Sequence, residues 1–201
     1  MTCIVGIARD GRVVIGGDSA GVDSRYQLTV RSDQKVFRAG PIIAGFTTSF
    51  RMGQLLRYSL KVPERQPEQD VFEFMATAFV DAVRKTLRDG GYATKKDEVE
   101  SAGVFLVGYA GRLFQIQSDY QVSENAAGFD ACGCADGIAL GAVDVLLSHY
   151  ELNKGAVPLL YVVNAALQAA ERWSAGVRGP FTIIDSAEEC EKGVAASCLS
   201  T

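Results

Sequence analysis

The stretch MTCIVGIARDGRVVIGGDSAG, residues 1–21, contains two runs of mostly apolar, β-branched residues separated by Asp10-Gly11. Asp-Gly between two such runs is a strong sequence signal for a β-hairpin with a two-residue turn. The second run ends in Gly16-Gly17, which is typical of a strand that another part of the backbone approaches closely. We therefore predict that the fold begins with an antiparallel hairpin whose outer ends lie side by side.

The two-residue turn decides which residues face one another across this hairpin. Residue 9 pairs with residue 12, so Cys3 lies opposite Asp18 and Thr2 lies opposite Ser19. Asp18 is then expected about 7–8 Å from the chain start, along the diagonal of the pair. Strict alternation places the Asp18 side chain on the face of Cys3. A β-bulge at Gly16-Gly17 could turn it toward Thr2.

The rest of the chain groups into blocks of strands and blocks of helices. Strands are expected at 35–38, 41–46, 104–109, 112–116, 130–133 and 181–185, and helices at 49–60, from 71 to the Gly90-Gly91 pair, at 137–150 and at 157–172. Segregated blocks argue against a parallel sheet built from βαβ units. We predict an α+β fold, a four-layer αββα sandwich of two antiparallel sheets flanked by helix pairs. It is expected to form a single domain over 1–185, followed by a partly disordered tail over 186–201.

Composition and charge exclude several classes of protein. The 201 residues include 20 Lys and Arg against 24 Asp and Glu, a net charge of −4, and this length fits one domain. No apolar run is long enough to span a membrane, and the first residues lack the basic start of a secretory signal. A slightly acidic chain is not expected to bind nucleic acid. We therefore expect a cytoplasmic protein with neither a membrane nor a nucleic-acid partner.

Cysteine and histidine counts narrow the chemistry further. The cysteines are odd in number and lack a repeating spacing, which fits reduced cytosolic thiols better than a disulfide framework; they are Cys3, Cys132, Cys134, Cys190 and Cys198. His149 is the single histidine, so a site with several histidine ligands is excluded. We expect no metal and no cofactor.

Thr2 carries the candidate chemistry. Removal of Met1 leaves a threonine with a free α-amine, and the hydroxyl can then attack while the amine accepts its proton. An α-amine has a pKa of about 7.7–8.0, which suits a general base. Lys35, held between Asp18 and the Thr2 hydroxyl, would lower the pKa of both groups. The plain alternatives stay open: an ordinary strand start, a turn aspartate that caps its own backbone, and a solvated surface lysine.

An ordered set of segments resembles a known family. The segments are TCIVGI at 2–7, DGRVVIGGD at 10–18, KV at 35–36, IAGF at 43–46, CGCAD at 132–136 and ERWSAG at 171–176. They resemble the β-type subunits of proteasomes, most closely the HslV-like peptidases. The interval from Thr2 to Asp18 matches the family, whereas Lys35 falls one residue late. The resemblance runs from Thr2 to about Ile184, nearly the whole chain.

The resemblance implies a set of catalytic residues. Thr2 would be the nucleophile, and Asp18 with Lys35 its activating ion pair. The α-amine would be held by groups from the later segments. The implied set is Thr2, Asp18, Lys35, Cys134, Glu171 and Ser174, in which Glu171 replaces an aspartate of the family and Cys134 a serine. A thiol is a weak hydrogen-bond donor and acceptor, so Cys134 is a notable departure.

The resemblance also implies the residues that bind substrate. The strand at 43–46 corresponds to the one that carries the oxyanion-hole backbone, and the glycine-rich stretch after it here reads Thr47-Thr48-Ser49. Phe46, Thr47 and Thr48 are the implied oxyanion and substrate-binding residues, with the Thr48 N–H as donor. Phe37 and Phe50, together with Phe46, would line an apolar, aromatic first specificity pocket. A core position is the alternative for all three, and the preferred one for Phe37 and Phe50.

The implied function is that of a threonine-type endopeptidase in a self-compartmentalising, stacked-ring homo-oligomer that cleaves protein or peptide substrates. An ATP-dependent unfoldase is then an implied partner, since the chain has no phosphate-binding loop of its own. Two alternatives remain. One is a catalytically silent ring or scaffold protein, favoured by Cys134 and Thr47–Ser49. The other is an amidase of the same N-terminal-nucleophile fold that acts on a small non-peptide amide.

Overall fold

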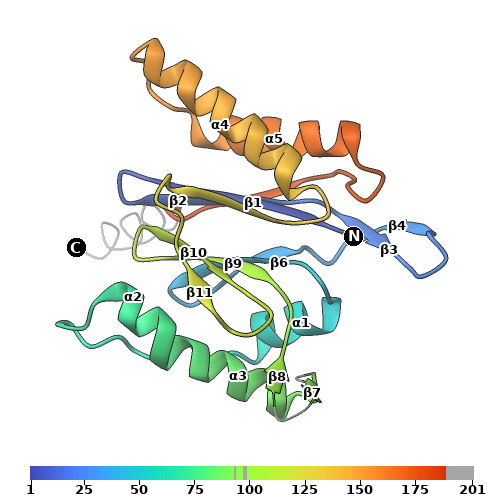
Figure 1. Ribbon diagram of the computed structural model, residues 1–201, viewed down its shortest axis with the longest axis vertical. Coiled ribbons are helices and arrows are strands. Elements are labelled where there is room, and N and C mark those ends of the chain that lie inside the picture. Colours follow the sequence, from blue (N-terminus) through green and yellow to red (C-terminus); the bar gives the residue numbers. More distant parts are fainter. Residues whose placement is uncertain (93, 97–98, 189–201) are drawn as a thin grey trace, which may run out of the picture.

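The computed structural model describes residues 1–92, 94–96 and 99–188 and has four layers (Figure 1). Helices α4 (Asp136–Leu152) and α5 (Leu159–Trp173) cover one sheet. The second sheet is covered by α1 (Phe50–Tyr58) and by a continuous run formed by α2 (Val71–Phe74), a π-helical turn (Met75–Phe79) and α3 (Val80–Asp89). The predicted α+β sandwich is therefore confirmed. Within the described residues, no helix has the length and apolar character needed to cross a membrane.

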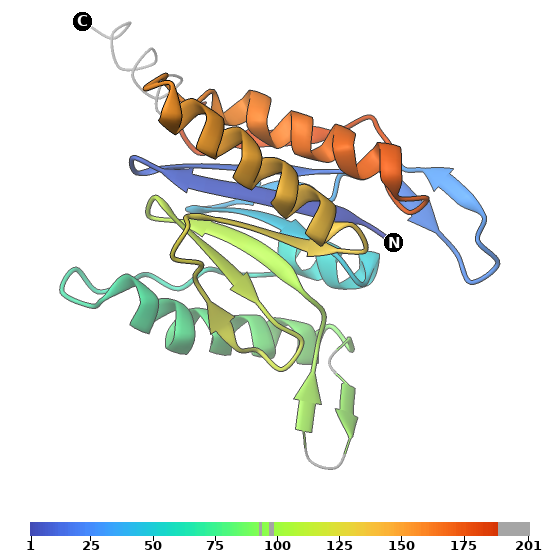
Figure 2. The same ribbon diagram turned by 45° about the horizontal axis from the view of Figure 1, so that its top comes forward.

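Both sheets are antiparallel. The first has four strands in the order β12 (Phe129–Gly133), β1 (Cys3–Arg9), β2 (Arg12–Gly17) and β13 (Thr182–Asp185). The second has five, in the order β11 (Val122–Ser123), β10 (Arg112–Ile116), β9 (Phe105–Tyr109), β6 (Ile42–Phe46) and β5 (Val36–Ala39). Two ribbons that the sequence pattern does not predict project from the sandwich (Figure 2). They pair β3 (Ala20–Val22) with β4 (Leu28–Val30), and β7 (Thr94–Lys96) with β8 (Val99–Ser101).

The first hairpin has the predicted register. Arg9 pairs with Arg12 and Ile4 with Gly17, and Asp10 and Gly11 both have positive φ angles, as a tight hairpin turn requires. No β-bulge interrupts the pairing, because Gly17 also pairs regularly with β13 on its other side. Just after β2, the Asp18 N–H donates to the Cys3 carbonyl oxygen at 3.3 Å. The Asp18 carboxylate reaches Lys35 of the second sheet, whereas the Cys3 side chain packs under α4 and α5.

Three apolar cores hold the four layers together. One lies under α4 and α5, one under α1 to α3, and the third between the sheets, where Ile4 is fully buried. Glycines let the sheets approach closely at this third core: a Cβ on Gly17 or Gly45 would lie 2.6 or 2.5 Å from Ile4 side-chain atoms. This tight contact sets the start of β1 directly against the strands that follow Lys35.

Asp185 anchors the end of β13. Its buried carboxylate accepts hydrogen bonds from the guanidinium of Arg12, and its carbonyl oxygen accepts one from Arg38 Nη2 at 2.7 Å. The hydrogen bonds from Arg12 hold the pKa of Asp185 below its ordinary value of 3.8. The strand contacts continue to Ser186, whose N–H donates to the Val13 carbonyl oxygen at 2.8 Å. Most of the expected tail, from residue 189 on, lies outside the described residues.

We expect Asp185→Asn to lower the free energy of unfolding by about 2 kcal/mol at neutral pH, because it weakens charge-assisted hydrogen bonds. The folded-state pKa is the lower one, so this contribution is complete above the unfolded-state value of 3.8 and is lost as pH falls through the folded-state pKa. Urea unfolding of both proteins should show a clear difference at about pH 7 and a smaller one at about pH 3. An equal difference at both values would contradict this electrostatic origin.

Candidate active site

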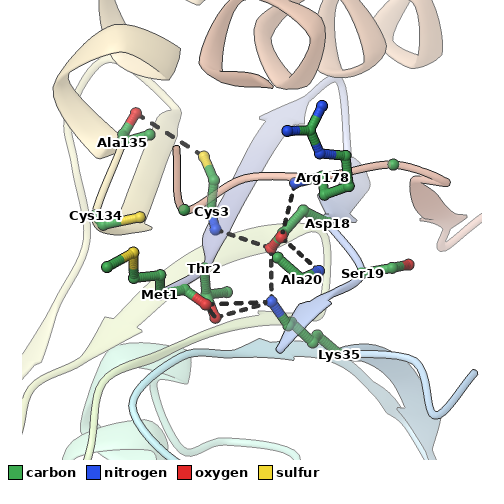
Figure 3. Close-up of polar contacts among 12 residues, drawn as sticks. Met1, Thr2, Cys3, Asp18, Ser19, Ala20, Lys35, Cys134, Ala135 and Arg178 are labelled. Atoms are coloured by element: carbon green, nitrogen blue, oxygen red, sulfur yellow. Dashed lines mark hydrogen bonds and ion pairs between the residues drawn. The ribbon is translucent and has the colours of Figure 1, made fainter. Parts of the chain in front are cut away.

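Thr2, Asp18 and Lys35 meet at one end of the sandwich (Figure 3). Thr2 precedes β1, Asp18 follows β2 and Lys35 precedes β5, so the two sheets both contribute. Lys35 Nζ donates to Thr2 Oγ1 at 2.9 Å and to Asp18 Oδ1 at 2.8 Å. All three residues are buried, with 7%, 2% and 1% of their surface exposed, respectively. A charged pair is thus placed directly against a threonine hydroxyl.

The Asp18 carboxylate is fully hydrogen-bonded. Besides Lys35, it accepts the backbone N–H of Cys3 at 3.0 Å, of Ala20 at 2.8 Å and of Arg178 at 3.3 Å. Such a set of donors holds a buried carboxylate in place and stabilises its charge. The contact with Cys3 follows from the regular register, and Lys35 then spans the remaining distance to Thr2. No bulge is needed to complete the cluster.

Burial lowers the pKa of Lys35 from its ordinary 10.5, and this effect outweighs the opposing effect of Asp18. The ammonium donates to Asp18 and Thr2 and lies 3.5 Å from the Met1 carbonyl oxygen. A positive charge at this distance favours an ionised Thr2 oxygen over a neutral one.

Met1 is joined to the Thr2 nitrogen by the first peptide bond of the chain. The Thr2 hydroxyl donates to the Met1 carbonyl oxygen, and a Cβ on Gly176 would lie 2.5 Å from Met1 Cβ and 2.7 Å from Cys134 Sγ. The methionine therefore packs between Thr2 and the segment after α5, close to Cys134. Because its carbonyl is bonded to the Thr2 nitrogen, a free α-amine exists only once Met1 is removed.

Cys134 and Ser174 lie together beside Met1. The Cys134 N–H donates to the Thr2 carbonyl oxygen at 2.8 Å, and its Sγ is 3.7 Å from Ser174 Oγ. Ser174 Oγ in turn accepts the N–H of Gly176 at 3.3 Å. Cys134 thus contacts Thr2 directly, and Ser174 is connected to it through Cys134.

Glu171 contacts the segment that follows α5. Its Oε1 accepts the N–H of Gly179 at 3.0 Å and pairs with Arg178 Nη1 at 3.8 Å. The backbone N–H of Arg178 is one of the donors to Asp18. Glu171 therefore supports the segment that reaches Asp18, and its contacts are with that segment rather than with Thr2.

The stretch after β6 has an unusual backbone. Thr48 has φ = 68°, which is rare for a β-branched residue, and such conformations are concentrated at functional sites. The Thr47 N–H donates to the Val104 carbonyl oxygen at 3.0 Å, and the Val104 N–H donates to Thr48 Oγ1 at 3.2 Å. The backbone around Thr48 is thereby held against the start of β9.

The three phenylalanines differ in environment. Phe37 and Phe46 belong to the core under α1, with 1% and 5% of their surface exposed. Phe50 packs edge-on against Phe46 and is only half-buried. Its ring centroid lies 5.7 Å from Lys35 Nζ and 3.8 Å from the guanidinium carbon of Arg31. Phe50 is thus the phenylalanine that borders the Thr2 cluster.

Sequence reasoning missed several residues around the site. The Ser19 backbone N–H donates to the Arg178 carbonyl oxygen at 2.8 Å, and the Ser19 hydroxyl donates to the Pro180 carbonyl oxygen at 2.5 Å. Arg31 forms a two-point pair with Asp33, with both N–O distances at 2.7 Å. The only sequence signal for the second pair is the presence of opposite charges two residues apart, just before Lys35.

Two antiparallel sheets stacked between helical layers are the fold that this chain shares with proteasome-type proteins of known structure. The sequence matches no family model and no curated protein sequence. The fold is similar to that of Thiobacillus denitrificans BPH, solved in complex with epoxomicin, with a TM-score of 0.70 and 19% identity over 92% of this chain and 97% of that one.

Two further solved structures have the same fold. Eukaryotic HslV from Trypanosoma brucei has a TM-score of 0.64 at 16% identity and covers 92% of this chain and 98% of its own. Anbu (ancestral beta-subunit) from Yersinia bercovieri has a TM-score of 0.61 at 13% identity and covers 100% of this chain and 97% of its own. At these identities the likeness establishes the fold. The resemblance to HslV-like proteins drawn from the sequence is confirmed at that level.

Proposed function

We propose that this chain is a threonine-type endopeptidase whose nucleophile is Thr2 after removal of Met1. The observation that carries the proposal is the position of Lys35 Nζ, 2.9 Å from Thr2 Oγ1 and 2.8 Å from a buried aspartate. A core that needed only stability would not bury an ion pair against a hydroxyl, because a buried ion pair is often no more stable than apolar residues of the same volume. The similar BPH was solved in complex with epoxomicin, and this supports the proposal.

In the proposed reaction the Thr2 α-amine removes the proton from Oγ1 as Oγ1 bonds to the peptide carbonyl carbon. The Thr48 N–H donates to the resulting oxyanion. Collapse breaks the C–N bond, and the proton passes from the amine to the leaving nitrogen. Water, deprotonated by the same amine, then adds to the acyl ester, the C–Oγ1 bond breaks, and the amine returns the proton to Oγ1. Lys35 stabilises the developing negative charge on Oγ1, and Asp18 keeps Lys35 oriented.

We further propose that copies of the chain assemble into stacked rings around an inner chamber in the cytoplasm, fed by a separate ATP-dependent unfoldase. The outer helical layer exposes several large apolar side chains, as a contact surface does: Val145, Leu152, Leu160, Tyr161 and Trp173. A surface of this kind is suited to contact with other copies.

Two alternatives differ from this proposal in what they predict. A silent scaffold is favoured by the thiol of Cys134 and by Thr47–Ser49, and it would assemble without hydrolysing peptides. An amidase for small amides would need no chamber and would elute from gel filtration near the 21.5 kDa of one chain. The proposed peptidase elutes as a much larger particle, and its cleavage of a peptide reporter stops after treatment with a peptide epoxyketone.

The thiol of Cys134 permits a separate prediction. Cys134 Sγ lies 3.7 Å from Ser174 Oγ, beside the place where the α-amine would be held. Replacing Cys134 with serine puts a stronger hydrogen-bond donor and acceptor there. We expect kcat/KM for a peptide reporter to stay equal or to rise up to about tenfold. A large loss would show that the thiol has a role of its own.

A further inference from the structure

A guanidinium covers the aromatic ring next to the proposed nucleophile. The Arg31 guanidinium carbon lies 3.8 Å from the Phe50 ring centroid, and Lys35 Nζ lies 5.7 Å from the same centroid. Lys35 Nζ is itself 2.9 Å from Thr2 Oγ1. The ring, and Arg31 on it, are therefore within reach of the first side chain of a peptide bound at Thr2, that of the residue whose carbonyl is attacked.

Arg31 is held in this place from both ends. Its backbone N–H donates to the Ser19 carbonyl oxygen at 2.9 Å, one residue after Asp18. Its side chain donates through Nε and Nη2 to the two carboxylate oxygens of Asp33. A guanidinium has five N–H donors in a rigid fork, so two points of contact orient it and leave others for a ligand. About a third of the side chain, 34%, is exposed.

The charge around Arg31 and Phe50 is positive. Arg31 is the principal cause of a lowered pKa at Asp33, and the charge of Arg57 on α1 adds to it. Arg31 is paired with Asp33 and the Lys35 ammonium with Asp18, and Arg57 adds a further positive charge near Asp33. A carboxylate that enters here gains charge-assisted hydrogen bonds. An apolar side chain would have to displace Arg31 from the Phe50 ring.

We infer that Arg31 determines specificity at the subsite next to Thr2 and directs cleavage to peptide bonds that follow an acidic residue. This rests on the proposed peptidase function. It differs from the apolar, aromatic first specificity pocket that the resemblance implied, because Phe37 and Phe46 are core residues and Arg31 lies over the Phe50 ring.

The test uses the assembled, Met1-free protein and three peptide reporters that differ only in the residue before the scissile bond: glutamate, leucine or arginine. We expect kcat/KM for the glutamate reporter to exceed that for the leucine reporter by at least about tenfold. Arg31→Gln should reduce this ratio at least about tenfold. Asp33→Asn keeps one acceptor oxygen for Arg31 but removes the competing negative charge, so it should raise the ratio several-fold. Arg51→Gln is the matched control, because Arg51 donates to the Gly90 carbonyl oxygen on the α3 side, and its ratio should equal that of the unaltered protein.

The possible outcomes distinguish the role of Arg31 from the peptidase function on which it rests. Cleavage of all reporters with a ratio that Arg31→Gln does not change overturns the role of Arg31 and leaves the peptidase intact. A ratio that favours leucine from the start does the same. Failure to cleave any reporter, without an epoxyketone adduct on Thr2, overturns the peptidase and this inference together. Thermal unfolding of each variant shows whether the Arg31 substitution acts through folding instead.

Discussion

Thr2→Ala is expected to reduce peptide hydrolysis at least about 10³-fold while leaving the fold unchanged. The hydroxyl is the atom that bonds to the substrate in the proposed reaction, and removing a nucleophile costs more than removing a group that only polarises the substrate. Thr2 is small, precedes β1 and adds little to the apolar cores. The measurement is kcat/KM for a peptide reporter, with gel filtration and a thermal melt to confirm assembly and folding.

Thr2→Ser is the matched control for this substitution. Serine keeps the hydroxyl and, once Met1 is removed, the α-amine, so it should retain a measurable part of the activity. Undiminished hydrolysis by the Thr2→Ala protein would contradict the mechanism outright. Equal and complete loss in both variants would indicate that the substitutions act through structure rather than through the hydroxyl.

Lys35→Met is expected to reduce kcat/KM by about 10²–10³-fold, the usual effect of removing one electrostatic contact to the reacting oxygen. It should also lower the free energy of unfolding by about 3–5 kcal/mol, because the buried Asp18 carboxylate loses its cation. The exposed Lys61, replaced in the same way, serves as control and should change neither quantity.

The double variant Lys35→Met/Asp18→Asn separates these two effects. It removes both charges, so most of the lost stability should return while hydrolysis stays low. In the unaltered protein, burial lowers the pKa of Lys35 from its ordinary value of 10.5. As the pH rises, Lys35 should therefore lose its charge, and hydrolysis should decline, before the pH reaches 10.5. Full activity in the stable double variant would show that the ion pair is only structural.

Local signals in the sequence were sufficient for the frame of the site. Asp10-Gly11 predicts a two-residue turn, the turn sets the register, and the register places Asp18 against Cys3, as the structure has it. Segregated strand and helix blocks predict the layers. These inferences succeed because they depend on neighbours along the chain or across one hairpin.

Contacts between the sheets could not be derived in that way. Lys35 directly precedes a strand of the second sheet, so its contact with Thr2 depends on how the sheets stack, and no local pattern in the sequence determines that contact. The stacking of Arg31 on Phe50 joins the segment before β5 to α1 and has no periodic signal. Glu171 lies in the last turn of α5, and the chain after α5 brings the Gly179 N–H to its carboxylate.

The most direct test of the central claim is the intact mass of the purified protein before and after incubation with a peptide epoxyketone. We expect a chain that lacks Met1 and gains one adduct, which peptide mapping localises to Thr2. Thr2→Ala should gain none. A chain that lacks Met1, takes no adduct and cleaves no reporter would contradict the claim that Thr2 is a working nucleophile.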